Sequence, residues 1–249
     1  MMAAVAAREL SDGEVVFVGI GLPNLACNLA RRTHAPHLVL IYESGAVGAS
    51  PSRLPVSIGE PALVTGSLMV CGMADLFQLF LQNGRIEVGF LGGAQVDRYG
   101  NINTTVIGPY ERPKVRLPGS GGAAEIAIHA RRTLIVSKLS PRAFPERVDF
   151  VTSPGQRVNG RSRKELGGGL PGAGPVKVIT DKGVLEADEA SGEMVLAGLY
   201  PGVEAADVKA GVGWELRCRP RLARLDPPTP TQLRLLRDVL DPKRLYLKG

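Results

Sequence analysis

A short apolar run that leads through glycines into a helix most constrains how this sequence can fold. Residues 15–18 are uniformly apolar and are followed by Gly19-Ile20-Gly21, and the segment 23–32 carries leucine and alanine at helical spacing. Residues 38–42 form the next continuous apolar run. Two apolar strands joined by a helix pair in parallel, with a right-handed crossover. The sequence therefore predicts a β-α-β unit near its start.

The same alternation of strands and helices continues toward the C-terminus. Helical patterns cover residues 2–10, 75–82, 123–130, 203–210 and 231–240. Strand patterns cover residues 86–91, 133–137, 194–199 and 214–218, with hairpins predicted for 176–187 and for 102–107 against 86–91. Residues 152–175 are rich in glycine and proline and are predicted as a surface loop or a flap over a ligand.

This order of elements predicts an α/β fold: a mostly parallel open sheet with helices on both faces. With 249 residues the chain can bury a substantial core, and we expect a single domain over residues 1–249. In such sheets, ligands bind beyond the carboxyl ends of the strands. The functional residues are therefore sought where apolar strands end.

Composition narrows the classes of function. Hydrophobic residues make up 44% and charged residues 22% of the chain, which excludes a disordered protein. No uncharged apolar stretch approaches the roughly 18 residues of a membrane span, and Arg8 and Glu9 come too early for a secretory signal. Cys27, Cys71 and Cys218 are far apart and odd in number, which favours reduced thiols. We expect a soluble cytoplasmic protein that is not bound to a membrane.

The net charge and the positions of the histidines restrict the kinds of ligand that the chain is expected to bind. The charge of +6 is spread along the sequence and aromatics are only 5%, so nucleic-acid binding is not expected. An anionic small ligand or an acidic partner chain would suit this charge equally. His34, His37 and His129 are scattered and form no pattern typical of a metal site or of an activated nucleophile. No metal is predicted.

Glu43 is the first candidate for chemistry, because it follows the apolar run 38–42 directly. Ser44 and Gly45 come next, and residues this small let a ligand approach closely and offer backbone amides. An acidic residue at a strand end is also a common cap or member of a salt bridge, so that alternative stays open. The position nevertheless predicts a carboxylate at the edge where α/β proteins place their sites.

Two further segments carry candidate residues. Gly121 and Gly122 lie in the glycine-rich segment 117–125, which enters a helix and would offer free amides to an anion or oxyanion, or would serve only as a tight turn. The spacing of these glycines is not that of a dinucleotide-binding or phosphate-binding loop. In the segment 92–103, Asp97 could orient a loop through charge-assisted hydrogen bonds and Asn101 could serve a turn or a ligand.

Several segments together resemble a known family. They are Tyr42-Glu43-Ser44-Gly45, residues 53–61, GFLGGAQVDRYGNINTTVIG at 89–108, GSGGAAEIA at 119–127, residues 200–203 and residues 240–242. In this order they resemble the beta subunit of class I CoA-transferases, most closely the glutaconate CoA-transferase type. The resemblance covers nearly the whole chain and implies the fold shared by CoA-transferases and phosphosugar isomerases.

The resemblance implies a mechanism and a partner. Glu43 stands at the position of the nucleophile that attacks an acyl-CoA thioester, forming an acyl-glutamyl anhydride and then a glutamyl-CoA thioester. Gly121 and Gly122, with Ser44 and Gly45, would form the oxyanion and CoA-binding part of the site. Coenzyme A enters as a substrate, without a metal or flavin, and the active site requires a separate alpha subunit in a hetero-oligomer. Which acid and acyl-CoA react is left open.

The family segment 89–108 also contains Gln95, Asp97 and Asn101, for which the resemblance leaves either a substrate-binding or a loop-orienting role. Three other functions compete with CoA transfer. A hydrolase subunit of the same family that opens rings of CoA thioesters shares this segment. A non-catalytic structural subunit would leave the chemistry to its partner. A sugar-phosphate-binding module would need basic residues in the glycine-rich loop, and residues 117–125 contain no Lys or Arg.

Overall fold

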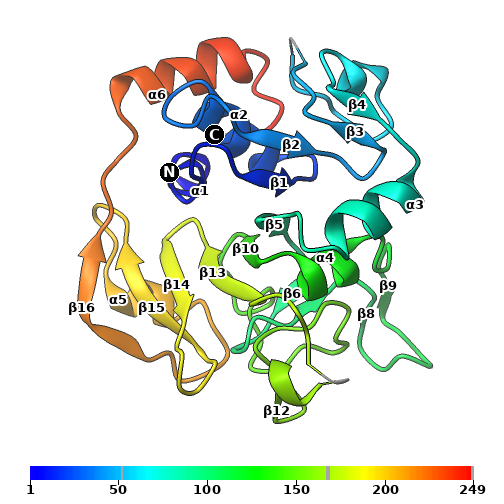
Figure 1. Ribbon diagram of the computed structural model, residues 1–249. Helices are drawn as coiled ribbons and strands as arrows, with labels where there is room; N and C mark the ends of the chain where they lie inside the picture. Colours follow the sequence, from blue (N-terminus) through cyan, green and yellow to red (C-terminus); the bar gives the residue numbers. More distant parts are fainter. Residues whose placement is uncertain (52, 167–168, 248–249) are drawn as a thin grey trace. The chain divides into compact units, whose positions relative to one another are not determined.

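The computed structural model describes residues 1–51, 53–166 and 169–247, and the chain divides into two compact units (Figure 1). Unit 1 comprises Met1–Phe90 and Pro227–Gly249, and unit 2 comprises Leu91–Asp226. The single domain expected over residues 1–249 stays a prediction.

Unit 1 contains the predicted β-α-β motif. Strand β1 (Val15–Phe17) pairs in parallel with β2 (Val39–Ile41) and with β5 (Val88–Leu91), and helix α2 (Leu22–Arg31) joins β1 to β2. The sheet continues from β2 through antiparallel β3 (Ala46–Val47) to the edge strand β4 (Met69–Val70). The parallel strands are short, buried and apolar, as the sequence predicts.

The helices of unit 1 come from distant parts of the chain. Helix α1 (Met2–Arg8) packs against α2, and α2 also contacts the π-helix η4 (Leu235–Leu240), which continues α6 (Pro230–Arg234). Thr229 begins α6 with a capping box, since its hydroxyl accepts a hydrogen bond of 3.2 Å from the Gln232 amide. The predicted helix 75–82 is present as α3 (Met73–Asp75) and the π-helix η2 (Leu76–Leu81), after the 3-10 turn η1 (Pro61–Val64).

Unit 2 contains a second run of paired strands. Strand β10 (Arg132–Val136) is parallel to β13 (Pro175–Ile179), which forms the predicted antiparallel hairpin with β14 (Gly183–Ala187). Next come β15 (Met194–Leu199), antiparallel to β14, and β16 (Cys218–Arg224), parallel to β15. Helix α4 (Ala123–His129) precedes β10, and α5 (Ala205–Lys209) lies between β15 and β16 along the chain.

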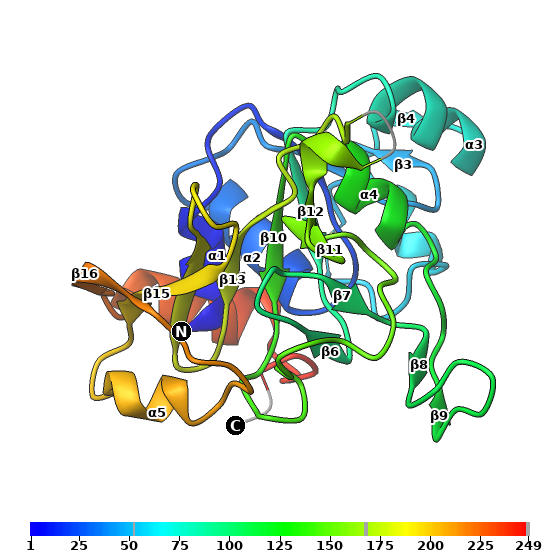
Figure 2. The same ribbon diagram turned by 90° about the horizontal axis from the view of Figure 1, so that it is seen from below.

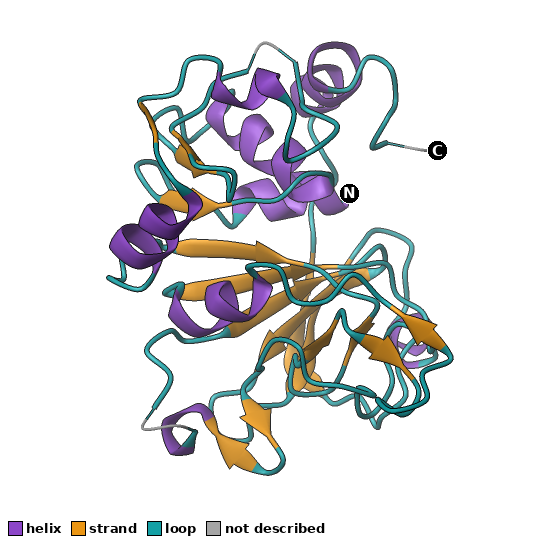
Figure 3. Ribbon diagram, turned by 90° about the vertical axis from the view of Figure 1, so that its right-hand side faces the viewer, coloured by secondary structure: helices purple, strands orange, loops and turns teal. Residues whose placement is uncertain are grey.

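Three small hairpins of unit 2 lie in its long connections, two of them before β10 and one between β10 and β13 (Figures 2 and 3). They are β6 (Gln95–Val96) with β7 (Ile102–Asn103), β8 (Val106–Ile107) with β9 (Val115–Arg116), and β11 (Arg157–Val158) with β12 (Arg161–Ser162). The last of them is followed by the 3-10 turn η3 (Arg163–Glu165). These hairpins carry most of the candidate residues of unit 2.

One predicted strand pairing and the position of one predicted strand are wrong. Residues 102–107 do not pair with 86–91, because β5 is occupied by β1 and Ile102 pairs instead with Val96 across a turn at Gly100, whose φ is 73°. The last strand covers Cys218–Arg224 rather than 214–218. This strand is largely exposed, so it lacks the apolar pattern on which the prediction depended.

The segment 152–175, predicted as a surface loop or a flap over a ligand, contains the β11–β12 strand pair and a buried arginine that connects it to distant carbonyls. The Arg163 guanidinium donates to the carbonyls of Gly172 at 2.9 Å, Gly155 at 3.2 Å and Ala127 at 2.8 Å. Burial lowers the pKa of Arg163 to about 10. Hydrogen bonds from one side chain thus replace the apolar packing that this sequence lacks. Residues 167–168 lie outside the described part.

Across the described residues, no helix is long and apolar enough to cross a membrane.

Candidate active site

Glu43 lies at the tip of a tight turn between β2 and β3. The Gly45 amide donates to the Tyr42 carbonyl at 2.9 Å, and the Tyr42 amide donates to the Ala46 carbonyl at 3.0 Å. Glu43 and Ser44 are thereby raised out of the strand ladder, with Glu43 half-buried and Ser44 exposed. The turn therefore places the Glu43 carboxylate outside the sheet, and backbone hydrogen bonds fix the position of its main chain.

Gly45 is required by both the backbone and the packing of this turn. Its φ is 104°, a conformation that residues with a side chain rarely adopt. A Cβ at this position would lie 2.0 Å from the Cys71 carbonyl oxygen, and the Cys71 amide donates to the Gly45 carbonyl at 3.1 Å. The segment leading out of β4 therefore packs directly on the turn that carries Glu43.

The residue before Glu43 is anchored in the core of unit 1. The Tyr42 hydroxyl donates to Asn24 Oδ1 at 2.7 Å, and Asn28 Nδ2 donates to the same oxygen at 2.8 Å. Tyr42 is fully buried, and this burial raises its pKa above the usual range, so the phenol stays protonated. Sequence reasoning did not find the Asn24–Asn28 pair, although its i, i+4 spacing at the start of a predicted helix is a usable signal.

The Glu43 carboxylate has neither a hydrogen bond nor an ion pair with any described residue. The alternative roles of cap and salt-bridge member are therefore not realised in the structure. The side chain is left available to an acyl group, a solvent molecule or another chain.

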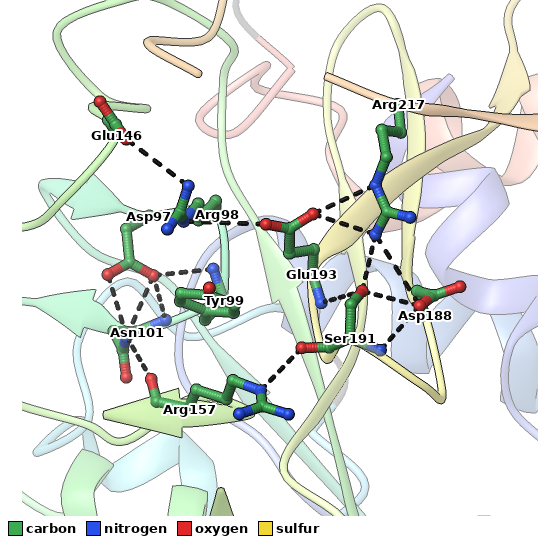
Figure 4. A network of polar contacts seen from close by, with 10 residues as sticks. All are labelled: Asp97, Arg98, Tyr99, Asn101, Glu146, Arg157, Asp188, Ser191, Glu193 and Arg217. Atoms are coloured by element: carbon green, nitrogen blue, oxygen red, sulfur yellow. Dashed lines mark hydrogen bonds and ion pairs between the residues drawn. The ribbon is translucent and has the colours of Figure 1, made fainter. Parts of the chain in front are cut away.

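In unit 2, Asp97 and Asn101 form a closed polar cluster (Figure 4). Asp97 Oδ1 accepts from the Tyr99 and Asn101 amides at 3.0 Å each, and Asn101 Nδ2 donates to Asp97 Oδ2 at 2.9 Å. Asn101 also bonds the Arg157 carbonyl at 2.8 Å and the Gly155 amide at 2.7 Å. Burial raises the pKa of Asp97, and the hydrogen bonds from Asn101 and Tyr99 oppose that rise. Both side chains thus form hydrogen bonds to loop backbone.

Gln95 is also fully engaged within unit 2. Its Oε1 accepts from Asn103 Nδ2 at 2.7 Å and from the Asp149 amide at 3.0 Å, while its Nε2 donates to Asp149 Oδ2 at 3.2 Å. The same Asp149 oxygen accepts from the Gly108 amide at 2.8 Å. Gln95 therefore fixes the base of the β8–β9 hairpin, which agrees with the loop-orienting alternative.

The glycine-rich loop is attached to the same network. The Leu117 amide donates to the Thr105 carbonyl at 2.9 Å and the Gly119 amide to the Thr104 carbonyl at 2.8 Å. Thr105 Oγ1 lies 2.7 Å from Thr152 Oγ1, which also accepts from the Thr104 amide. These threonines carried no signal in the sequence, because hydroxyl pairs between distant segments have no spacing rule.

Gly121 and Gly122 follow this attachment and begin α4. Gly121 is exposed with a φ of 49°, and Gly122 is half-buried at the N-cap. The structure thus places Asp97 and Asn101 in one polar cluster of unit 2 and Gln95 in another, which reaches the glycine-rich loop through the bond from the Thr105 amide to Asn103. Glu43, Ser44 and Gly45 lie in unit 1, and each group is described within its own unit.

A cavity of about 510 Å³ opens beside the Asp97 cluster. Arg98, Arg147 and Arg157 line it with Glu146. Arg98 lies 3.5 Å from Glu146 and 3.9 Å from Glu193, which pairs with Arg217 at 2.9 Å (Figure 4). Among the cavity cations, Arg98 is thus paired with carboxylates, whereas Arg147 donates to Asn159 Oδ1 and Arg157 to the Ser191 carbonyl. Among the described residues, no cluster of His, Cys, Asp or Glu side chains is placed to hold a metal.

Comparison with known proteins identifies the family. Residues 1–211 match the family model described as coenzyme A transferase. The chain is 50% identical to the beta subunit of 3-oxoadipate CoA-transferase from Pseudomonas knackmussii, covering 95% of this chain and 90% of that protein. It is 37% identical to the beta subunit of glutaconate CoA-transferase from Acidaminococcus fermentans, covering 100% of this chain and 94% of that protein.

The crystal structure of the Acidaminococcus fermentans glutaconate CoA-transferase matches with a TM-score of 0.91, over 100% of this chain and 96% of that chain, at 36% identity. A cholesterol ring-cleaving hydrolase IpdB subunit of Mycobacterium tuberculosis is 28% identical, over 97% of this chain and 94% of that protein. By its fold the chain is an α/β protein of the glutaconate CoA-transferase type. It belongs to the coenzyme A transferase family.

These findings confirm the predicted resemblance, the α/β fold and the expectation of a CoA-transferase beta subunit. They do not test the individual site residues, which stay predictions.

Proposed function

We propose that this chain transfers CoA from an acyl-CoA to a carboxylic acid, with Glu43 as the nucleophile and a separate alpha subunit as partner. The observation that carries the proposal is the half-buried Glu43 carboxylate on a rigid turn, unpartnered within the described chain. A carboxylate is a weak nucleophile, so positioning and a covalent intermediate have to supply much of the rate acceleration.

The proposed reaction proceeds through covalent intermediates on the Glu43 carboxylate. A Glu43 carboxylate oxygen attacks the thioester carbonyl, the carbon–sulfur bond breaks, and an acyl-glutamyl anhydride and CoA thiolate form. The thiolate then attacks the glutamyl carbonyl, which releases the first acid and leaves a glutamyl-CoA thioester. A second carboxylate reverses these steps and departs as the new acyl-CoA. No proton or electron is consumed overall.

Each tetrahedral intermediate places a negative charge on oxygen, which requires donors. We propose the amides of the Gly121–Gly122 segment for this role, together with Ser44 at the exposed end of the Glu43 turn. The Gly45 amide is already bonded to Tyr42, so Gly45 acts through the shape of the turn. Removing one oxyanion donor typically costs about 3 kcal/mol of barrier. Gln95, Asp97 and Asn101 act as positioning residues behind the glycine-rich loop.

Exposed apolar side chains beside the Glu43 turn support an alpha-subunit partner. Leu68 is 78% exposed, Val70 60% and Met73 56%, on and next to the edge strand β4 that pairs with β3. Clustered exposed apolar residues mark protein interfaces. An alpha chain covering this face would also enclose Glu43. On this proposal the two units serve together as one beta-subunit domain, in the cytoplasm.

We further infer that the acid substrate is a dicarboxylate. The relatives at 50% and 37% identity are named for 3-oxoadipate and glutaconate, which both carry two carboxylates. The surplus of positive charge in this chain suits such an acid.

The decisive experiment is intact mass analysis of the chain co-purified with its alpha partner and incubated with acyl-CoAs of dicarboxylic and simple acids. We expect a CoA-sized mass increase that maps to Glu43 and is absent from Glu43→Gln. An adduct elsewhere, or transfer that persists in Glu43→Gln, would contradict the assignment. The resemblance to a ring-cleaving hydrolase favours a second candidate, which would release CoA or open a ring without any adduct.

A further inference from the structure

The β8–β9 hairpin carries positive charge on a surface that the proposed mechanism does not use. Arg112, Lys114 and Arg116 lie within five residues and are all exposed, with Glu111 as the only acidic residue between β8 and β9. No ion pair connects any of the three cations to a described carboxylate. They differ in this respect from Arg98 and Arg217, whose charges are matched.

Strand geometry directs two of these cations to one side. Val106 pairs with Arg116 and Ile107 with Val115, and the Lys114 amide extends the ladder by donating to the Ile107 carbonyl at 2.8 Å. Residues two apart on a strand share a face, so Lys114 and Arg116 point to the same side.

Aromatic contacts brace the hairpin. The rings of Tyr110 and Phe150 stack with centroids 5.4 Å apart, and the Arg116 guanidinium lies 5.0 Å from the centroid of the Tyr110 ring. At the base, Asp149 accepts from the Gly108 amide and from Gln95. The cations are therefore displayed on a structured hairpin and not on a free tail. Figure 2 shows β8 and β9 leading away from β6 and β7.

The hairpin also leads directly into the glycine-rich loop. Leu117 and Gly119 continue the pairing beyond Arg116 through their bonds to Thr105 and Thr104, and Gly121 follows two residues later. Gly121 is five residues beyond Arg116, a span of at most about 18 Å. An extended pantetheine arm, which joins the thiol of CoA to its diphosphate, has a comparable reach.

We propose that the β8–β9 hairpin binds the phosphates of CoA through Lys114 and Arg116, with Arg112 adding to the local positive charge. The inference rests on the proposed function, since it assumes that the thioester end of CoA reaches the Gly121–Gly122 segment. Phosphate oxygens accept charge-assisted hydrogen bonds from both side-chain types. The hairpin would then contribute substrate affinity, and Glu43 the chemistry.

The test separates phosphate binding from catalysis by comparing CoA with pantetheine, which lacks all three phosphates. Binding of each to the assembled complex is measured by titration calorimetry for wild type, Lys114→Gln, Arg116→Gln and the double variant. We expect each single variant to weaken CoA binding about three- to tenfold and to leave pantetheine binding unchanged. Raising the salt concentration should reduce the difference between wild type and variants.

The matched control is Lys209→Gln, which removes an exposed cation on α5 in the same unit and should change neither affinity. Equal weakening of CoA and pantetheine, no weakening of either, or no CoA binding by wild type would overturn the inference. So would loss of the alpha chain from the variants, because the hairpin would then be a protein interface. Phosphate-dependent CoA binding without any transfer would overturn only the proposed function.

Discussion

The Glu43 turn in unit 1 and the loop cluster around Asp97 in unit 2 each contain an acidic side chain, but the two carboxylates differ in their hydrogen bonding. The Glu43 carboxylate is half-buried with no hydrogen-bond or ion-pair partner among the described residues. The Asp97 carboxylate is buried and accepts hydrogen bonds from Asn101 and Tyr99. The backbone at Glu43 is fixed while its side chain is not, whereas at Asp97 the side chain fixes the backbone.

This difference separates a group that reacts from a group that positions. A nucleophile has to exchange partners during the reaction, so bonds within its own chain would have to break at every turnover. A positioning carboxylate is more effective the more completely its oxygens are bonded. We therefore expect substitution of Glu43 to change activity more than stability, and substitutions in the cluster to do the reverse.

Glu43→Gln should have the largest effect. Turnover should fall by at least about three orders of magnitude, because the amide cannot form the anhydride. The free energy of unfolding should change by less than about 0.5 kcal/mol, since no bond within the described chain is lost. Steady-state kinetics and urea denaturation of the complex measure the two quantities. Glu189→Gln, at an exposed position, is the control that should alter neither.

Gly45→Ala tests whether the turn itself is rigid. The added Cβ would lie 2.0 Å from the Cys71 carbonyl oxygen at a φ of 104°, so strand β4 or the turn has to move. We expect a loss of about 2–4 kcal/mol of unfolding free energy, with turnover reduced because Glu43 shifts. The control is Gly13→Ala, where φ is 82° but nothing lies within 4 Å of the new Cβ. It should cost only about 1–2 kcal/mol, and equal costs at both positions would exclude close packing as the cause.

The position of Glu43 after a strand could be predicted from the sequence, but the tight turn and the antiparallel strand β3 that follows it were not. An apolar run followed by Glu43, Ser44 and Gly45 is a local sequence pattern. The parallel strands of unit 1 could likewise be predicted from their continuous hydrophobicity. The anchors of the turn are less visible, since the Tyr42–Asn24 bond and the approach of Cys71 to Gly45 join segments far apart in sequence. Those contacts exist only once the sheet has formed.

The cluster shows what local patterns miss. Asp97 and Asn101 are recognisable as turn residues, but their bonds to Gly155 and to the Arg157 carbonyl connect them to a segment expected to be a loop. Likewise, the buried Arg163 belongs in the sequence to an ordinary basic run of the kind found on surfaces. Long-range polar bonds of this kind leave no periodicity, so the 157–162 hairpin was not predicted from the sequence.

Asn101→Ala should affect stability more than chemistry. It removes the donor to Asp97, the acceptor of the Gly155 amide and the bond to the Arg157 carbonyl, which leaves buried polar groups unsatisfied. We expect a loss of about 2–3 kcal/mol of unfolding free energy, measured by urea denaturation. The KM for acyl-CoA should change more than kcat if the cluster only orients loops. A loss of kcat at unchanged stability would instead place Asn101 in contact with substrate.

The smallest effect expected is a pH dependence carried by Asp97. Its pKa is raised by burial above the usual value of 3.8, so the folded protein binds this proton more tightly than the unfolded chain does. Ionised Asp97 therefore lowers the stability of the folded protein at neutral pH. Stability rises as the pH falls through the pKa of Asp97 in the folded protein, and this contribution becomes constant below 3.8, where the carboxyl is protonated in both states. Asp97→Asn should abolish this component, which urea denaturation of both proteins between pH 7 and about pH 4 measures. The contrary result would be that wild type loses stability relative to Asp97→Asn as the pH falls. Hydrogen bonds to the carboxylate would then outweigh its burial, and the cluster would stabilise the ionised form of Asp97.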